Sequence, residues 1–262
     1  MEMKLEGRRA LVCGASQGIG RATAETLAEL GAEVTITARN EQALRSVCDG
    51  LDRSHQQNHD WFASDFDQPE KLQGLVQEHA KSGRPYSILV NNSGGPPGGP
   101  AHTAETDAYT QAFQRHLICN QILLQTLLPG MREQGFGRII NIISTSVREP
   151  IPGLGVSNTV RGAVASWAKT VAHELAPDGI TVNNVLPGFT RTDRLEKLFT
   201  TKADKTGRSF AEVEQDALAQ VPMGRFAEPE EVAAAVGFLA APAAGYITGH
   251  SIPVDGGRTR SI

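Results

Sequence analysis

Short apolar runs rich in β-branched residues recur along the chain, and turn-forming residues flank each of them. Runs that are apolar throughout, instead of alternating with polar residues, are typical of parallel strands buried on both faces. They predict strands at residues 10–13, 34–38, 87–91, 138–143, 181–186 and 251–254.

Between these runs lie longer segments whose apolar residues recur at intervals of three and four, as on one face of a helix. They predict helices at residues 19–30, 41–51, 69–81, 106–132, 156–175 and 229–240. Regular alternation of strand and helix predicts an α/β protein with a Rossmann fold, a doubly wound parallel sheet of about seven strands with helices on both faces. No repeat or linker divides the chain, so residues 1–262 are expected to form a single domain.

Two segments interrupt this alternation. Residues 94–100 read Gly-Gly-Pro-Pro-Gly-Gly-Pro, a composition that excludes a helix or a central strand and predicts a shaped loop where a strand ends. Residues 191–221 are charged, have a helical pattern and follow the strand predicted at 181–186. Ligands of open α/β sheets bind at the carboxyl ends of the strands, so we expect 191–221 to form a lid over the substrate.

A glycine-rich turn joins the first predicted strand to the first helix. Glycine permits the tight turn and leaves room for the backbone to approach a pyrophosphate at a helix N-terminus. The residues expected to hold that group are Gly14, Ser16, Gln17, Gly18, Ile19 and Gly20. A glycine triplet alone is a weak indication, but its place between a strand and a helix favours a dinucleotide site over a purely structural turn.

The second predicted strand ends at Ala38 and Arg39, where a dinucleotide fold meets the adenosine ribose. An acidic residue there would bond the free 2′-hydroxyl of NAD, and none is present. Arg39 offers a planar cation suited to a 2′-phosphate, which favours NADP(H) and leaves NAD(H) as the second choice. The alternative is that Arg39 is a solvated surface charge.

Further motifs make the chain similar to the short-chain dehydrogenase/reductase family, close to its 3-oxoacyl-carrier-protein reductases, along essentially its full length. They are Asp65, Asn91-Asn92-Ser93-Gly94 in place of the family's Asn-Asn-Ala-Gly, Pro187-Gly188 followed by Thr192, Ile247-Thr248-Gly249 and Val254-Asp255-Gly256-Gly257. The resemblance implies that Asp65 bonds the adenine amine, with Phe66 beside it, and that Asn92 and Gly94 line the cofactor cleft. It also implies that the nicotinamide end meets Pro187, Gly188, Phe189, Thr190 and Thr192.

The catalytic positions depart from this family. Its members donate a proton from a tyrosine, assisted by a lysine four residues later and a serine thirteen residues earlier. Here those positions hold Ser157, Arg161 and Ser144, and the family's assisting asparagine corresponds to His116. Tyr86, Tyr109 and Tyr246 are not followed four residues later by Lys or Arg, so no other tyrosine restores the pair.

Three groups could replace the missing acid: His116 through its near-neutral titration, a water held by Ser144 and Ser157, or a donor delivered from the lid. His116 could instead be a buried histidine without a catalytic role. The main hypothesis is an NADP(H)-dependent oxidoreductase that interconverts a ketone and a secondary alcohol. The alternatives are a cofactor-binding protein without redox turnover, such as a sensor or pseudoenzyme, and a non-redox enzyme that uses His116.

Charge and composition limit the classes of partner that the protein is expected to bind. The formal net charge of −4 argues against nucleic acid or an anionic membrane as the main partner. No apolar stretch approaches the roughly 20 residues of a membrane span, and the three cysteines lack metal-ligand or disulfide spacing, so a cytoplasmic protein without a metal site is expected. The expected partner is a small carbonyl or alcohol substrate. The resemblance implies a homotetramer or homodimer that pairs the long helices at 106–132 and 156–175.

Overall fold

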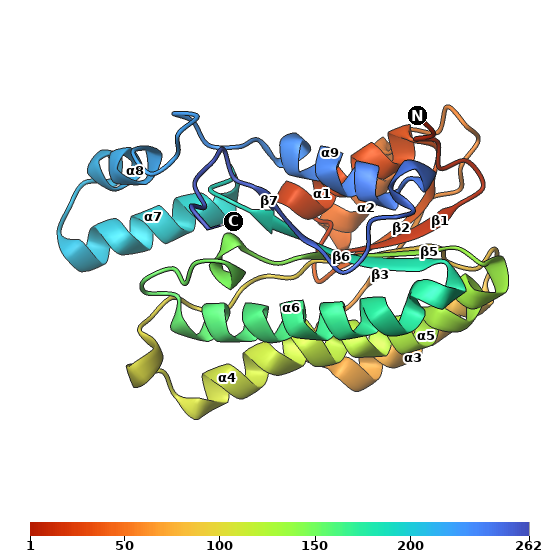
Figure 1. Ribbon diagram of the computed structural model, residues 1–262, viewed down its shortest axis with the longest axis horizontal. Helices are drawn as coiled ribbons and strands as arrows, with labels where there is room; N and C mark the ends of the chain where they lie inside the picture. Colours follow the sequence, from red (N-terminus) through yellow and green to blue (C-terminus); the bar gives the residue numbers. More distant parts are fainter. Residues whose placement is uncertain (262) are drawn as a thin grey trace.

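A parallel β-sheet runs through the centre of the molecule (Figure 1), as seen in a computed structural model that describes residues 1–261. Within these residues it has seven strands in the order β3-β2-β1-β4-β5-β6-β7, all paired in parallel. The strands are β1 (Arg9–Cys13), β2 (Glu33–Ala38), β3 (Asp60–Ala63), β4 (Ile88–Asn91), β5 (Gly137–Ile142), β6 (Ile180–Pro187) and β7 (Ser251–Val254). The reversal of strand order between β1 and β4 creates the crevice in which such sheets bind ligands.

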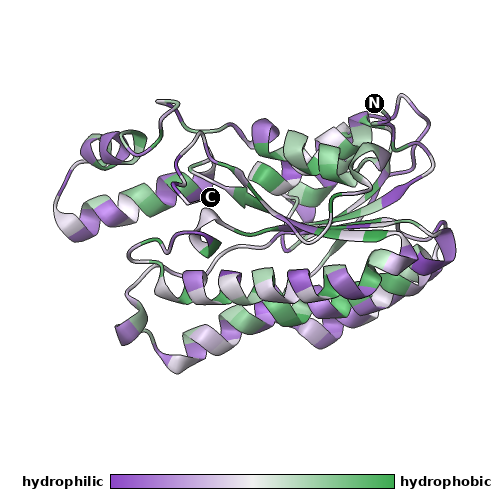
Figure 2. Cartoon of the chain, in the orientation of Figure 1, coloured by the Kyte–Doolittle hydropathy of each residue, from purple (hydrophilic) through white to green (hydrophobic). Residues whose placement is uncertain are grey.

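Helices cover both faces of the sheet (Figure 1). On one face lie α1 (Gly18–Glu29), α2 (Glu41–Gly50) and α9 (Pro229–Ala240), and on the other lie α3 (Pro69–Lys81), α4 (Thr106–Phe113), α5 (Cys119–Gln134) and α6 (Gly155–Leu175). Their apolar sides turn toward the strands (Figure 2), and each face has its own buried cluster. The predicted doubly wound fold is confirmed.

The predicted strands agree with the structure to within one residue at each end, but the sequence ranges omitted β3. This strand has only four residues, begins at an exposed aspartate and lies at the edge of the sheet. Of its four side chains only that of Phe62 is buried. An edge strand this short lacks the continuous apolar run by which buried strands are recognised.

The long helix predicted at 106–132 is interrupted by a π-helical turn at Gln114–Ile118, between α4 and α5. A π turn carries one extra residue per turn and is frequent at functional sites. Here it contains His116, which is buried and points toward the carboxyl ends of the central strands, where it lines a cavity with residues of β4 and its loop.

A chain of side-chain hydrogen bonds crosses the sheet near the carboxyl ends of its central strands. Asn91 donates to Asn141 over 2.8 Å, Asn141 donates to Asn184 over 2.9 Å, and Asn184 donates to the Ser251 hydroxyl over 3.0 Å. Buried amides are costly unless they are bonded, so this chain holds the ends of β4, β5 and β6 in a fixed register.

The segment 191–221 contains α7 (Asp193–Thr206) and α8 (Phe210–Leu218), which project from the end of the sheet (Figure 1). They have a small apolar cluster of their own around Phe199, Val213 and Phe226. The segment, named the lid after its expected role, therefore packs on its own apolar side chains and follows directly after β6. The residues at 94–100 lie opposite its first turn and, as predicted, form neither helix nor strand.

Candidate cofactor cleft and active site

The glycine turn is packed tightly against the loop after β4. Gly14 and Gly18 have positive φ angles of 61° and 56°. A Cβ on Gly14 would lie 2.7 Å from the Asn92 carbonyl oxygen, and one on Gly20 would lie 2.7 Å from the Asn92 side-chain nitrogen. Asn92 also donates a hydrogen bond to the Gly14 carbonyl over 3.2 Å. The turn and Asn92 thus form one rigid unit at the switch point of the sheet.

The residues at this turn fit the pyrophosphate of a dinucleotide. Helix α1 begins at Gly18, and its N-cap residue, Gln17, makes no side-chain capping bond. No acidic residue lies in the first turn. The N–H groups and the positive end of the helix dipole are therefore available to an anion.

The end of β2 has the character expected for a 2′-phosphate. Arg39 is exposed, and within residues 1–261 it forms no ion pair. The next residue, Asn40, accepts a hydrogen bond from the Ala43 N–H over 3.0 Å and so caps α2. Asp65 follows β3 at the neighbouring strand end. The side chain of Phe66, the next residue, packs in the core, so Phe66 would contact a cofactor through its backbone.

The residues expected at the nicotinamide end follow β6. Gly188 is required by close packing, since a Cβ there would lie 2.7 Å from the Asp255 Cβ. Thr192 caps α7 by accepting a hydrogen bond from the Leu195 N–H, and its methyl group would lie 3.1 Å from a Cβ on Gly18. The glycine turn and the start of the lid are therefore neighbours. Phe189 packs into the lid's aromatic cluster, with its ring centroid 5.7 Å from that of Phe226.

Ser144 lies just beyond the end of β5, and its hydroxyl accepts a hydrogen bond from the Ser146 N–H over 3.0 Å. Ser157 and Arg161 lie one turn apart on α6, and both are buried. The Arg161 guanidinium donates to the Ile142 carbonyl over 3.0 Å, which ties α6 to the end of β5. The sequence-predicted positions thus belong to two elements that are bonded directly to each other.

His116, which is buried, and Ser93, which is partly buried, form a pair in a small polar cavity that Arg161 also lines. The Ser93 hydroxyl lies 2.7 Å from His116 Nδ1, and His116 Nε2 has no hydrogen-bond partner within residues 1–261. Burial and, to a smaller extent, the charges of Arg161, Arg115 and Arg194 together lower the pKa of His116 from 6.5 to about 2. The imidazole is therefore neutral near pH 7, which removes the near-neutral titration on which its expected role as acid depended.

The lowered pKa of His116 predicts a pH-dependent stability. The unfolded chain binds a proton at His116 below about pH 6.5 while the folded chain does not, so stability falls as pH drops from 7 toward 2. At pH 5 the loss from this residue is about 2 kcal/mol. Urea unfolding at pH 7 and pH 5 measures it, and a His116→Asn variant should show a loss smaller by about that amount. An equal pH dependence in the two proteins would contradict the assignment.

Two residues of the site were not singled out from the sequence. Ser93 had a detectable signal, because it stands where the resembled family has alanine while His116 replaces that family's asparagine. The observed Ser93–His116 bond accounts for both departures together. Arg194 had no signal, since it is one cation in a charged helix, yet it reaches across to the loop after β4 and donates to the Gly95 carbonyl over 3.3 Å.

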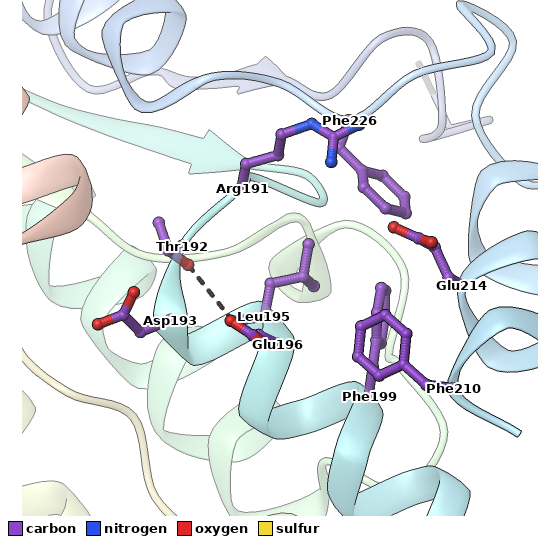
Figure 3. Close-up of a pocket in the computed structure, with 9 residues that line it drawn as sticks. All are labelled: Arg191, Thr192, Asp193, Leu195, Glu196, Phe199, Phe210, Glu214 and Phe226. Carbon is purple, nitrogen blue, oxygen red and sulfur yellow. Dashed lines mark hydrogen bonds between the residues drawn. The ribbon is translucent and has the colours of Figure 1, made fainter.

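A larger cavity of about 330 Å³ lies within the lid (Figure 3). Phe199, Phe210 and Phe226 form its apolar side, and Arg191 and Glu214 lie at its rim. Thr192 is the only sequence-predicted site residue among those that line it. The positions predicted to be catalytic therefore lie outside this cavity.

The described residues contain neither a metal-binding cluster nor a membrane-spanning helix. Among residues 1–261, no group of three or more His, Cys, Asp or Glu side chains is placed to hold a metal ion. In the same part of the chain, no helix has the length and apolarity that a bilayer crossing requires.

Known proteins resemble this chain over nearly its whole length. A family model described as enoyl-(acyl carrier protein) reductase matches residues 14–259. A 3-oxoacyl-[acyl-carrier-protein] reductase of Vibrio cholerae is 36% identical over 257 residues, which cover 97% of this chain and 98% of the relative. The NADPH-dependent reductase BacG of Bacillus subtilis is 32% identical over 97% of this chain and 99% of its own.

Solved structures agree with these sequence relatives. The L-sorbose reductase of Gluconobacter frateurii, complexed with NADPH and L-sorbose, superposes with a TM-score of 0.93 at 30% identity over 100% of both chains. The actinorhodin polyketide ketoreductase with NADPH has a TM-score of 0.90 at 31% identity over 97% of both chains. The chain has the same fold as these reductases. It belongs to the short-chain dehydrogenase/reductase family of oxidoreductases.

Proposed function

We propose that this protein is an NADP(H)-dependent oxidoreductase that interconverts a ketone and a secondary alcohol, with substrates similar to those of 3-oxoacyl reductases. The observation that carries the proposal is the uncapped glycine turn of α1 joined to Asn92, which lines one small cavity with Arg161, while Ser144 lies just past the end of β5. The relatives described as NADPH-dependent reductases and ketoreductases support the same chemistry.

The chain's own residues divide the binding of the cofactor among three strand ends. The α1 turn would hold the pyrophosphate, Arg39 the 2′-phosphate and Asp65 the adenine, while Thr190 and Thr192 would meet the nicotinamide. Bound NADPH supplies a hydride to the carbonyl carbon. Arg161 lies where the family places its lysine, and its fixed positive charge would bond the nicotinamide ribose without passing a proton onward.

The proton in our proposal comes from a water molecule held between the Ser144 and Ser157 hydroxyls, and the hydroxide left behind takes up a proton from bulk solvent. A serine hydroxyl is too weak an acid to replace a phenol unaided, but two hydroxyls can orient a water toward the carbonyl oxygen. His116 is neutral near pH 7 and is bonded to Ser93, so we assign it to the support of this wall of the site. The third candidate acid was a group from the lid. The lid side chain that reaches the loop after β4 is Arg194, and an arginine is a poor proton donor.

Turnover assays test this function directly. The purified protein is mixed with NADPH and a panel of ketones that includes 3-oxoacyl thioesters, and the absorbance of the reduced nicotinamide is followed. We expect reduction of at least one ketone and the reverse oxidation of its alcohol with NADP⁺. Tight binding of NADPH with no turnover across the panel would overturn the proposed reaction.

A second candidate function follows from the same two positions. Ser157 and Arg161 replace a proton donor and its helper, so a protein that binds NADP(H) without turning it over, such as a sensor or a non-catalytic subunit, would need no further change in the cleft. Its signature is tight binding of NADPH by the wild-type protein together with no detectable reduction of any ketone.

The choice of NADP(H) over NAD(H) rests on Arg39. An Arg39→Ala variant should bind NADPH at least about tenfold more weakly, because a charge-assisted bond to phosphate contributes more than 1.4 kcal/mol. NADH affinity should change little. Titration of nicotinamide fluorescence measures both, with Arg45→Ala on the exposed side of α2 as the matched control. Equal NADPH affinity in wild type and Arg39→Ala would refute the assignment.

We also propose that the protein assembles as a homotetramer or homodimer through the helices at 106–134 and 155–175. Phe113 and Ile118, at the junction of α4 and α5, are 41% and 39% exposed although both are large apolar side chains. Pairing of these helices with those of a second copy would cover them.

A further inference from the structure

Two guanidinium groups converge on the loop after β4, one from α6 and one from the lid. A Cβ built on Gly95 would lie 2.6 Å from Arg194 Nη2 and 3.6 Å from Arg161 Nη2. Arg194 donates to the carbonyls of Gly95 and Pro96 over 3.3 and 3.4 Å. Both charges therefore face the same small region at the end of the sheet, beside the His116 cavity.

Neither cation has a carboxylate partner. Within residues 1–261 no acidic oxygen lies within 4.0 Å of Arg161 or Arg194, whereas Arg115, Arg208 and Arg225 each pair with a carboxylate at 2.6 Å. The bonds from Arg194 to carbonyls are longer than typical N–H···O bonds, so its charge is weakly compensated. Burial and the nearby Arg194 charge lower the pKa of Arg161, which indicates that the two cations repel each other.

An anion at this point would relieve the repulsion and form charge-assisted bonds in a partly desolvated cleft. Arg161 is held by the Ile142 carbonyl and belongs to the cofactor side of the cleft. Arg194 stands on the first turn of α7 and keeps part of its surface in solvent. It is thus the cation that a molecule entering under the lid would meet.

We propose that the substrate is an oxo acid or hydroxy acid, and that Arg194 binds its carboxylate from the lid. This rests on the proposed ketone–alcohol function and narrows its substrates from 3-oxoacyl compounds in general to those that carry a free carboxylate. A carboxylate complements the Arg194 guanidinium in charge and, with its two oxygens, in planar geometry. Arg194 is then a specificity-determining residue that selects anionic ketones over neutral ones.

Binding to the NADP⁺-loaded protein tests this without turnover, because the oxidised cofactor cannot reduce a ketone. Calorimetry compares levulinate and benzoylpropionate, each beside its neutral methyl ester. We expect each acid to bind at least about tenfold more tightly than its ester, as one charge-assisted bond predicts. Arg194→Met should abolish the preference and Arg194→Lys should keep part of it.

Lys205→Met is the matched control, since it removes an exposed cation about 16 Å farther along the same helix and should leave the preference intact. Acids that bind no better than esters, no binding of either, or an unchanged preference in Arg194→Met would overturn the inference. So would a loss of NADP⁺ affinity in Arg194→Met with the acid preference retained, which would place Arg194 on the cofactor.

The turnover panel separates this inference from the function on which it rests. Reduction of neutral ketones without an acid preference would leave the proposed function standing and remove the oxo-acid inference. A preference for acids with no turnover of any ketone would remove the proposed function. It would leave Arg194 as an anion site in a protein that only binds its cofactor.

Discussion

Replacing Gly20 with alanine should abolish NADPH binding and destabilise the fold by about 3 kcal/mol, the upper range for forcing atoms into a packed region. The added Cβ would lie 2.7 Å from both the Gly14 carbonyl carbon and the Asn92 side-chain nitrogen. Gly14 belongs to the turn and Asn92 to the loop after β4. The clash can therefore be relieved only if the turn and the loop move apart. The N–H groups that would hold the pyrophosphate then lose their common direction.

Urea unfolding and fluorescence titration with NADPH measure the two effects of Gly20→Ala. Gly74→Ala is a suitable control, because Gly74 is also helical but a Cβ there meets nothing within 4 Å. That control should be neutral or stabilising by up to about 1 kcal/mol, with unchanged NADPH affinity. Near-normal affinity in Gly20→Ala would show that the turn is not the cofactor site.

Local sequence patterns were sufficient for most of the fold. Buried strands such as β5 and β6 consist mostly of β-branched and other apolar residues, and the starts of α3 and α9 follow from proline at their first positions. The edge strand β3 and the π turn at 114–118 escaped prediction for different reasons. The first has almost no buried side chain, and the second changes the hydrogen-bonding of a helix without changing its apolar pattern.

The site was predictable where a residue acts through its position in a motif. The glycine turn and the pair Ser157 and Arg161 are of this kind. The charge state of His116 and the role of Arg194 depend on burial and on neighbours distant in the chain, which no local pattern contains. The sequence therefore predicts where a cofactor would bind but leaves both interpretations of His116 open, and the burial of its imidazole favours the one without near-neutral titration.

Ser144→Ala should reduce kcat by about 100-fold, the effect of removing one fixed donor to a developing negative charge, about 2.7 kcal/mol. NADPH affinity should not change, because Ser144 stands at the carbonyl side of the cleft. The serine also caps the short turn that follows it, so some stability is lost as well, about 1 kcal/mol. Steady-state kinetics at saturating NADPH measure kcat, with Ser166→Ala on the exposed face of α6 as the control.

A double-mutant cycle with Ser157→Ala distinguishes a shared water from two independent hydroxyls. If one water is held by both, either single substitution releases it, and the double variant should be little slower than Ser144→Ala alone. If each hydroxyl contacts substrate separately, the two losses in free energy should add. Unchanged kcat in Ser144→Ala would exclude both arrangements. If Ser157 and Arg161 occupy the positions of the family's tyrosine and lysine, as the sequence predicts, this cycle tests whether two serines and a water can replace a phenol as the source of the proton.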